Sequence, residues 1–107
     1  APSLAAPTLH RLLATIEEQG PSQLSLDALA QEADLGRYQL IRAFRAATGF
    51  TPHAYLLNAR VNRGRQLLGE GHPLAQVAYQ LGFADQSHFQ RVFKAHVGVT
   101  PGQYRQG

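Results

Sequence analysis

Residues 49–52 read GFTP and residues 98–101 read GVTP, so one pattern of glycine, threonine and proline occurs twice, 49 positions apart. Glycine is common directly after the last turn of a helix, and Thr-Pro is a common way to begin the next helix. The recurrence of this motif raises the question whether the chain contains two copies of one helical unit.

The sequences that precede and follow the two motifs also match. A shift of 49 gives seven identities in the sixteen positions 40–55, where unrelated sequences give about one. The identical pairs are Arg42–Arg91, Phe44–Phe93, Ala46–Ala95, Gly49–Gly98, Thr51–Thr100, Pro52–Pro101 and Tyr55–Tyr104. Upstream the shift becomes 48, which pairs Ala30 with Ala78, so the second copy carries one extra residue near ADQS. Self-similarity of this kind indicates a repeated structural unit.

Each copy is predicted to form two helices joined by a tight turn. In the first copy, Ser25 is a candidate N-cap for the helix LDALAQEA, DLGR breaks the pattern, and a second helix is expected over about residues 37–48. In the second copy, Pro73 stands at a helix start, LAQVAYQL follows, GFAD turns, and a helix is expected over about residues 86–97. Two helices joined by a short turn with glycine form the helix-turn-helix plan.

Two further helices are predicted outside these four. The segment TLHRLLATIEEQ places Leu9, Leu12, Leu13 and Ile16 on one face, as in a helix that covers a core. Between the copies, apolar residues recur from about 53 to 70, which predicts one continuous helix of about 18 residues and ~27 Å. Gly64 lies inside this helix, where glycine costs roughly 1 kcal/mol relative to alanine. The predicted organisation is all-α: a linker remnant at 1–7, a first helix-turn-helix subdomain at 8–52, a connecting helix at 53–70 and a second subdomain at 71–107.

The second helix of each copy is predicted to have an inner and an outer face. The inner stripes are Leu40, Phe44 and Ala47 in the first copy, and Phe89, Val92, Phe93 and His96 in the second. The outer faces are Tyr38, Ile41, Arg42 and Arg45 in the first copy, and Ser87, Gln90, Arg91 and Lys94 in the second. Arginine can pair with guanine O6 and N7, glutamine with adenine N6 and N7, and isoleucine can touch the thymine methyl. One such helix is better explained by a solvated surface, but matching helices on repeated units favour a shared function.

The charge of the chain is unevenly distributed. Residues 1–35 carry a net charge of −4 and residues 36–107 a net charge of +7, which gives the chain a total of +3. An excess of positive charge in the second part indicates a polyanionic partner. Charge alone is explained equally well by a basic surface that has no partner.

The composition excludes several kinds of site. The chain has no cysteine, so disulfides and thiolate metal sites are excluded, and no apolar run reaches the ~20 residues that span a membrane. The five histidines lack the spacing of a metal site. Neither a nucleophile–base pair nor a phosphate-binding glycine loop is recognisable, so neither an enzyme nor a cofactor is expected. The chain has no methionine and opens with APSLAAP, so it is expected to come from a longer protein.

Two segments carry a specific family pattern: SLDALAQEADLGRYQLIRAFRAATGFTPHAYL and PLAQVAYQLGFADQSHFQRVFKAHVGVTPGQYR. The second contains GF-x-D-Q-S-x-F-x-R-x-F-K followed by G-x-T-P-x-x-Y-R. Over residues 8–106 the chain resembles the DNA-binding domain of the AraC-type bacterial transcription regulators. The resemblance implies seven helices, two helix-turn-helix units joined by a long connecting helix, and sequence-specific binding of double-stranded DNA. The two recognition helices would then enter successive major-groove segments on one face of the duplex.

The resemblance also implies roles for individual residues. Base readout is expected from Tyr38, Ile41, Arg42, Gln86, Ser87, Gln90 and Arg91. Contacts to the DNA backbone are expected from Arg37, Arg45, His88 and Lys94, and the position of His88 can also meet a base. Ile41 replaces a more commonly polar residue, so the second unit is expected to be the better reader. Gly64 replaces a more common alanine in the connecting helix.

The resemblance implies partners as well. These are a double-stranded DNA operator, RNA polymerase, and an upstream effector-binding or dimerisation domain outside this chain, with a cytoplasmic location on the nucleoid. The alternatives are a helical protein-interaction module and a non-specific architectural DNA binder. Interaction helices expose apolar and aromatic anchors, whereas these helices are expected to expose mainly arginine, lysine, glutamine and serine.

Overall fold

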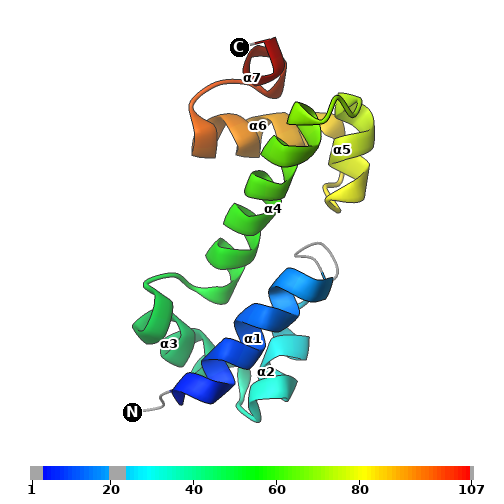
Figure 1. Cartoon of the computed structure of the whole chain (residues 1–107). Helices are drawn as coiled ribbons and strands as arrows, with labels where there is room; N and C mark the ends of the chain where they lie inside the picture. Colours follow the sequence, from blue (N-terminus) through cyan, green and yellow to red (C-terminus); the bar gives the residue numbers. More distant parts are fainter. Residues whose placement is uncertain (1–3, 20–23, 107) are drawn as a thin grey trace. The chain divides into compact units, whose positions relative to one another are not determined.

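The computed structural model describes residues 4–19 and 24–106, and within these ranges the chain forms seven α-helices and no β-strand (Figure 1). The helices are α1 (Ala6–Gln19), α2 (Leu26–Ala33), α3 (Arg37–Thr48), α4 (Pro52–Gly69), α5 (Leu74–Gln80), α6 (Gln86–Val97) and α7 (Pro101–Gln106). The predicted all-α fold is confirmed. No helix in these ranges is both long enough and apolar enough to cross a membrane.

The chain divides into two compact units, Ala1–Leu57 and Asn58–Gly107, and the division falls inside α4. The first unit contains α1, α2, α3 and the beginning of α4, and the second contains the rest of α4 with α5, α6 and α7. The subdomain boundaries inferred from the sequence stay a prediction. Helix α1 begins at Ala6, inside the predicted linker, and residues 1–3 of that linker lie outside the described residues.

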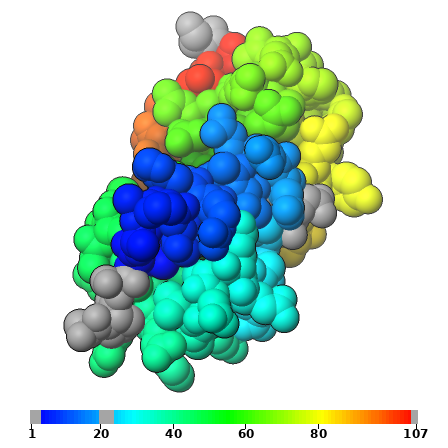
Figure 2. Space-filling model, turned by 60° about the horizontal axis from the view of Figure 1, so that its bottom comes forward, coloured from blue at the N-terminus to red at the C-terminus, as the bar shows by residue number. Residues whose placement is uncertain are grey.

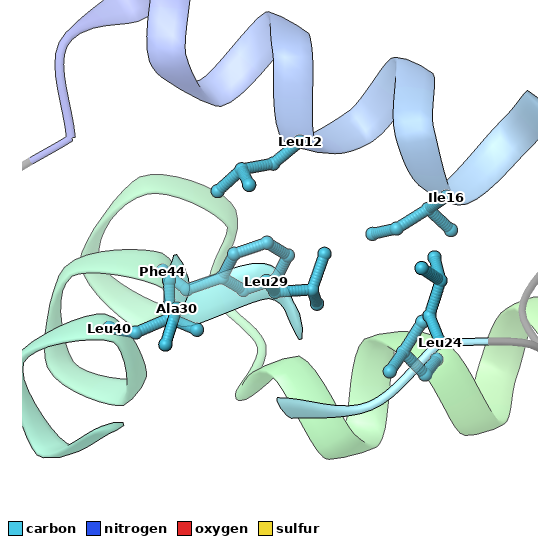
Figure 3. Packing of buried hydrophobic residues seen from close by; sticks show 8 residues of the cluster. Leu12, Ile16, Leu24, Leu29, Ala30, Leu40 and Phe44 are labelled. Atoms are coloured by element: carbon cyan, nitrogen blue, oxygen red, sulfur yellow. The ribbon is translucent and has the colours of Figure 1, made fainter. Parts of the chain in front are cut away.

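The core of the first unit is a cluster of apolar side chains contributed by all its helices. Figure 3 shows side chains of α1, α2 and α3 turned towards one another, together with Leu24 from the segment before α2. The buried members are Leu12, Ile16, Leu24, Leu29, Ala30, Leu40, Phe44 and Leu56. Helix α1 packs along α2, and the two lie side by side in Figure 2. As predicted, the amphipathic first helix covers this core.

The core of the second unit is built around aromatic rings. Phe89 and Phe93 of α6 are fully buried, with ring centroids 5.6 Å apart. Phe83 lies 5.2 Å from Phe89, and Tyr104 of α7 lies 5.5 Å from Phe93, so four rings form a continuous chain of contacts. Aliphatic side chains of α4 and α5 complete the core: Val61, Leu67, Leu68, Val77 and the turn residue Leu81. Aromatic pairs in tilted and edge-to-face arrangements stabilise such cores beyond the apolar area they bury.

The repeated GFTP and GVTP motifs end one helix and begin another in the same way. Gly49 and Gly98 adopt positive φ angles of 84° and 98°, and their N–H groups donate to the carbonyls of Arg45 and Lys94, each at 2.8 Å. A residue with a Cβ is strained in this left-handed conformation, which explains why both positions carry glycine.

The threonine and proline of each motif then start the following helix. The hydroxyl oxygens of Thr51 and Thr100 accept the N–H groups three residues later, each at 3.2 Å. Pro52 and Pro101 are fully buried at the first helical position, where a missing N–H leaves no hydrogen bond unmade. In the first unit Tyr55 packs against Phe44 with ring centroids 5.4 Å apart, as Tyr104 packs against Phe93 in the second. Both motifs therefore form the same structural junction, between α3 and α4 in the first copy and between α6 and α7 in the second.

The turn inside each helix-turn-helix is also built twice. The N–H groups of Leu35 and Phe83 donate to the carbonyls of Ala30 and Ala78, at 3.0 and 3.1 Å. The residue before each of these donors is left-handed: Gly82 has φ 80°, whereas its counterpart is Asp34 with φ 56°. Aspartate tolerates this conformation better than most residues, yet less well than glycine. Gly82 in the second copy thus corresponds to a strained aspartate, Asp34, in the first copy.

Gly64 is explained by the packing of α4 against α6. A Cβ added at Gly64 would lie 3.2 Å from both Cε1 and Cζ of Phe89 and 3.1 Å from Cδ1 of Leu81. These separations are shorter than the ~3.5–4.0 Å at which carbon atoms attract each other. Glycine lowers the intrinsic stability of α4 at this position, but it allows the Phe89 ring to approach the helix backbone.

Two residues assigned to the inner stripes are instead exposed. Ala47 and His96 occupy equivalent places in the last turns of α3 and α6, and both are accessible to solvent. The Nδ1 atom of His96 lies 2.9 Å from the carbonyl oxygen of Val92 in its own helix. Ala43, which was not assigned to the stripe, is buried with Leu40 and Phe44. The predicted inward position of these two residues was wrong, because no described helix covers either side chain in these last turns.

Candidate nucleic-acid interface

The starts of α3 and α6 are fixed by local hydrogen bonds. Asp85 caps α6, and its Oδ1 atom accepts the N–H of His88 at 2.7 Å. Gly36 has no side chain to cap α3, but its N–H donates to Oε1 of Gln39 at 3.0 Å. Each helix therefore begins at a defined residue, which sets the direction of every side chain that follows.

Helix α3 presents a continuous outer face. Tyr38 is 83% exposed, Arg42 and Arg45 are exposed, and Ile41 is half-buried at the edge of the face. Because a helix turns by about 100° per residue, these four side chains lie within an arc of about 100°. The opposite side carries Leu40, Ala43 and Phe44, all of them buried.

Helix α6 presents an equivalent outer face. Gln86, Ser87, Arg91 and Lys94 are exposed, and Gln90 is half-buried. Gln90 thus has the same intermediate burial as Ile41, its counterpart in the repeat. The outer residues predicted from the sequence are brought together on one face of each helix, separately in each unit.

Four basic side chains on these faces are available to a ligand: Arg42, Arg45, Arg91 and Lys94. All four are exposed, and none forms a side-chain hydrogen bond or an ion pair with any described residue. Arg45 and Lys94 also lie in the last turns of their helices, where positive charge is favoured by the helix dipole. The helix dipole does not explain the positive charges of Arg42 and Arg91, because these residues lie near the middle of their helices.

Arg37 is already paired within the first unit. Its Nε atom lies 3.2 Å from Oδ1 of Asp27 on α2, and the two side chains are 66% and 74% exposed. An exposed pair of this kind contributes little to stability. The pairing was not predicted from the sequence. The available signal was the charge of Asp27 in the first turn of α2, beside the start of α3.

His88 is half-buried, and its ring packs edge-on against Phe83 with centroids 5.3 Å apart. This contact holds the imidazole at the start of α6, next to the turn of the second unit. The expected contact between His88 and the DNA backbone stays a prediction.

Comparison with known proteins identifies the family of this architecture. A family model described as a helix-turn-helix domain matches residues 29–107. The AraC-type DNA-binding domain-containing regulator of Chromobacterium violaceum superposes with a TM-score of 0.85 at 32% identity, covering 94% of this chain and 90% of that one. The chain belongs to the AraC-type helix-turn-helix family. Its two units are the two helix-turn-helix subdomains of this family.

Other members of the family are similar over nearly the whole chain. The HTH-type transcriptional regulator MtrA of Neisseria gonorrhoeae is 32% identical over 98 residues, which are 91% of this chain and 33% of MtrA. The HTH-type transcriptional activator RhaS of Salmonella schwarzengrund is 33% identical over 100 residues, 92% of this chain and 36% of RhaS. The DNA-binding domain of AdpA, solved in complex with a target DNA, superposes with a TM-score of 0.84 at 28% identity, covering 92% of this chain and 90% of that one. The chain spans about a third of the length of the curated relatives it matches.

Proposed function

We propose that this AraC-family chain binds double-stranded DNA sequence-specifically, as the DNA-binding domain of a bacterial transcription regulator. One observation carries the proposal: two repeated helix-turn-helix units expose, at equivalent positions, basic and hydrogen-bonding side chains with no partner among the described residues. The AdpA domain, similar over 92% of this chain, was solved with a target DNA, and this supports the same class of ligand here.

Arg42 and Arg91 are the residues to which we assign guanine readout. An arginine in the middle of a recognition helix can donate two hydrogen bonds to O6 and N7 of guanine in the major groove. In the second unit, Gln86, Ser87 and Gln90 supply further donors and acceptors for base edges. Tyr38 and Ile41 occupy the corresponding face of the first unit, beside Arg42.

The remaining basic residues contribute affinity rather than sequence preference. Arg45 and Lys94 follow the readout arginines by one turn of helix, and we assign them to phosphate groups, together with Arg37 and His88. Phosphate contacts release counterions, so the affinity that they provide falls as salt concentration rises. Each unit would thus combine base contacts with backbone contacts.

The two recognition helices are proposed to enter successive major-groove segments of one operator. The relatives are about three times as long as this chain and are named as transcription regulators or activators, not as enzymes. An upstream effector-binding or dimerisation domain, contact with RNA polymerase and a location on the nucleoid belong to the same proposal for the whole protein.

The proposal is tested by selecting a cognate duplex from a random pool and measuring its affinity in the presence of excess bulk DNA. Arg42→Ala and Arg91→Ala should each weaken binding to the selected site by about 5- to 150-fold and relax the preference at one base pair. Arg11→Ala is the charge-matched control on α1; because Arg11 also donates a hydrogen bond to the Glu32 carbonyl at 3.4 Å, circular dichroism first confirms that this variant keeps its helices. We expect Arg45→Ala and Lys94→Ala to weaken all duplexes alike and to reduce the salt dependence.

Two results would contradict the proposal in different ways. Equal affinity for the selected duplex and for bulk DNA would indicate a non-specific architectural binder. No binding to any duplex at low salt, with normal helix content by circular dichroism, would favour a protein-interaction module.

A further inference from the structure

The two recognition helices differ in hydrogen-bonding capacity at one pair of equivalent outer positions. Position 41 in α3 is isoleucine, whereas position 90 in α6 is glutamine, and both side chains are half-buried at the edge of the outer face. Gln90 can both donate and accept hydrogen bonds, but Ile41 can do neither. The two units therefore cannot read the same feature of a base pair at this position.

Ile41 is not explained by the core of its own unit. Among the described residues it belongs neither to the buried cluster nor to the partly buried hydrophobic side chains packed against that cluster. Part of its side chain remains accessible, one turn after the highly exposed ring of Tyr38 and next to Arg42. An apolar side chain is therefore held at the outer face without being needed in the interior.

The chemistry of the major groove restricts what Ile41 can contact favourably. A base edge with a hydrogen-bonding group opposite Ile41 would lose water and gain no partner, which is unfavourable. Thymine alone of the four bases presents a methyl group there, at C5, and burying that methyl against isoleucine is favourable. The side chain therefore favours thymine and disfavours the other bases.

Resting on the proposed DNA binding, we propose that the first helix-turn-helix unit reads the C5-methyl group of a thymine through Ile41. That thymine lies in the same major-groove segment as the guanine read by Arg42, because both side chains belong to the outer face of α3. The first unit recognises a methyl group and a guanine, and the second unit recognises its bases by hydrogen bonds.

The experiment replaces each thymine of the selected duplex, one at a time, by deoxyuridine, which lacks only the methyl group and keeps every hydrogen-bonding group. At one thymine in the major-groove segment that contains the Arg42 guanine, affinity of the unmodified protein should fall about 4-fold, the ratio expected for one buried methyl group. Thymines elsewhere in the selected duplex serve as internal controls. This comparison needs no protein variant, so it does not depend on how a mutant folds.

Variants then assign the effect to the side chain. Ile41→Ala should bind the thymine and deoxyuridine duplexes equally, and Ile41→Val should retain part of the 4-fold ratio. Ile41→Gln introduces the residue found at the equivalent position 90, and a repeated selection should shift the preference from thymine towards adenine. Placing 5-methylcytosine where cytosine replaces the thymine should recover part of the lost affinity, because that base carries the same methyl group.

Failure of this inference differs from failure of the proposed function. Specific binding that no deoxyuridine substitution weakens, or a ratio that Ile41→Ala leaves unchanged, overturns methyl readout alone. Absence of any sequence preference in the selection overturns the proposed function as well. Circular dichroism of each variant confirms that the helices are retained before affinities are compared.

Discussion

Replacing Gly64 by alanine tests whether α4 and α6 pack as closely as the structure indicates. Alanine has the higher helix propensity, so the substitution by itself would stabilise a helix interior by about 1 kcal/mol. Here the new Cβ would meet the Phe89 ring at 3.2 Å and the Leu81 side chain at 3.1 Å. The ring cannot easily move, because it is fully buried and in contact with Phe83 and Phe93.

Overpacking of a well-filled core costs about 1–3 kcal/mol, which exceeds the gain in propensity. We therefore expect Gly64→Ala to lower the free energy of unfolding by about 1 kcal/mol, measured by urea unfolding followed by circular dichroism. Gly69→Ala is the matched control, because Gly69 ends the same helix and a Cβ there meets nothing within 4 Å. The control should leave stability unchanged or raise it slightly.

A second background separates crowding by the ring from other effects at Gly64. In a Phe89→Leu protein the aromatic ring is absent but the contact with Leu81 at 3.1 Å remains, so adding the Gly64→Ala change should destabilise clearly less, and the two substitutions should be non-additive. The reasoning is refuted if Gly64→Ala stabilises the protein as much as Gly69→Ala does. It is refuted equally if the destabilisation is unchanged in the Phe89→Leu background.

Three further predictions follow from the same structure. Asp34→Gly should raise the free energy of unfolding by about 0.5 kcal/mol and Gly82→Ala should lower it by about 1 kcal/mol, since both positions are left-handed; urea unfolding in which the two changes have the same sign would contradict this. Asp27→Asn should release Arg37 and raise the affinity for all duplexes several-fold at low salt, with stability changed by less than about 1 kcal/mol. Glu17→Gln removes the same charge from α1, and an equal gain in affinity from that control would show that the ion pair is unimportant. One alanine inserted where α4 passes between the two compact units should turn one unit by about 100° relative to the other and reduce affinity towards that of a single unit; a full footprint from a folded insertion variant would exclude a rigid two-unit mode of binding.

The two helix-turn-helix pairs were predictable because the same sequence pattern occurs in both copies. The segment before Gly49 and the segment before Gly98 each have an apolar stripe and a glycine stop, and in these features the two agree with each other. Each pattern alone is weak evidence for a helix, but its recurrence in the second copy is strong evidence for a repeated helical unit. The helices predicted over about 37–48 and 86–97 accordingly match α3 and α6.

Positions along the helix axis were less predictable than positions around it. Periodicity gives the angle of a side chain about its axis, and by that measure Ala47 and His96 face inward. It does not say whether another helix lies opposite at that height, and in the last turns of α3 and α6 none covers them. The close approach of Phe89 to Gly64 and the pairing of Asp27 with Arg37 depend on tertiary geometry in the same way.

The candidate interface was predicted as a set of residues, and the structure adds how they are presented. The outer positions were inferred from the repeat, and the structure exposes Arg42 and Arg91 without partners among the described residues. The half-burial of Ile41 and Gln90 could not be inferred, because it depends on neighbouring side chains rather than on helical angle.

The junction at Gly49–Tyr55 and its counterpart at Gly98–Tyr104 have a consequence for how such a chain can diverge. Each junction keeps the inner ring of its recognition helix in contact with a tyrosine, at 5.4 and 5.5 Å, whatever the outer residues are. After a duplication, the outer positions could therefore accumulate substitutions while folding stayed nearly neutral to them. Among the outer pairs, 38/87 and 41/90 have diverged and 42/91 is identical, whereas the junction pairs 44/93, 52/101 and 55/104 are all identical. New operator preferences can thus arise by single substitutions without loss of the folded state.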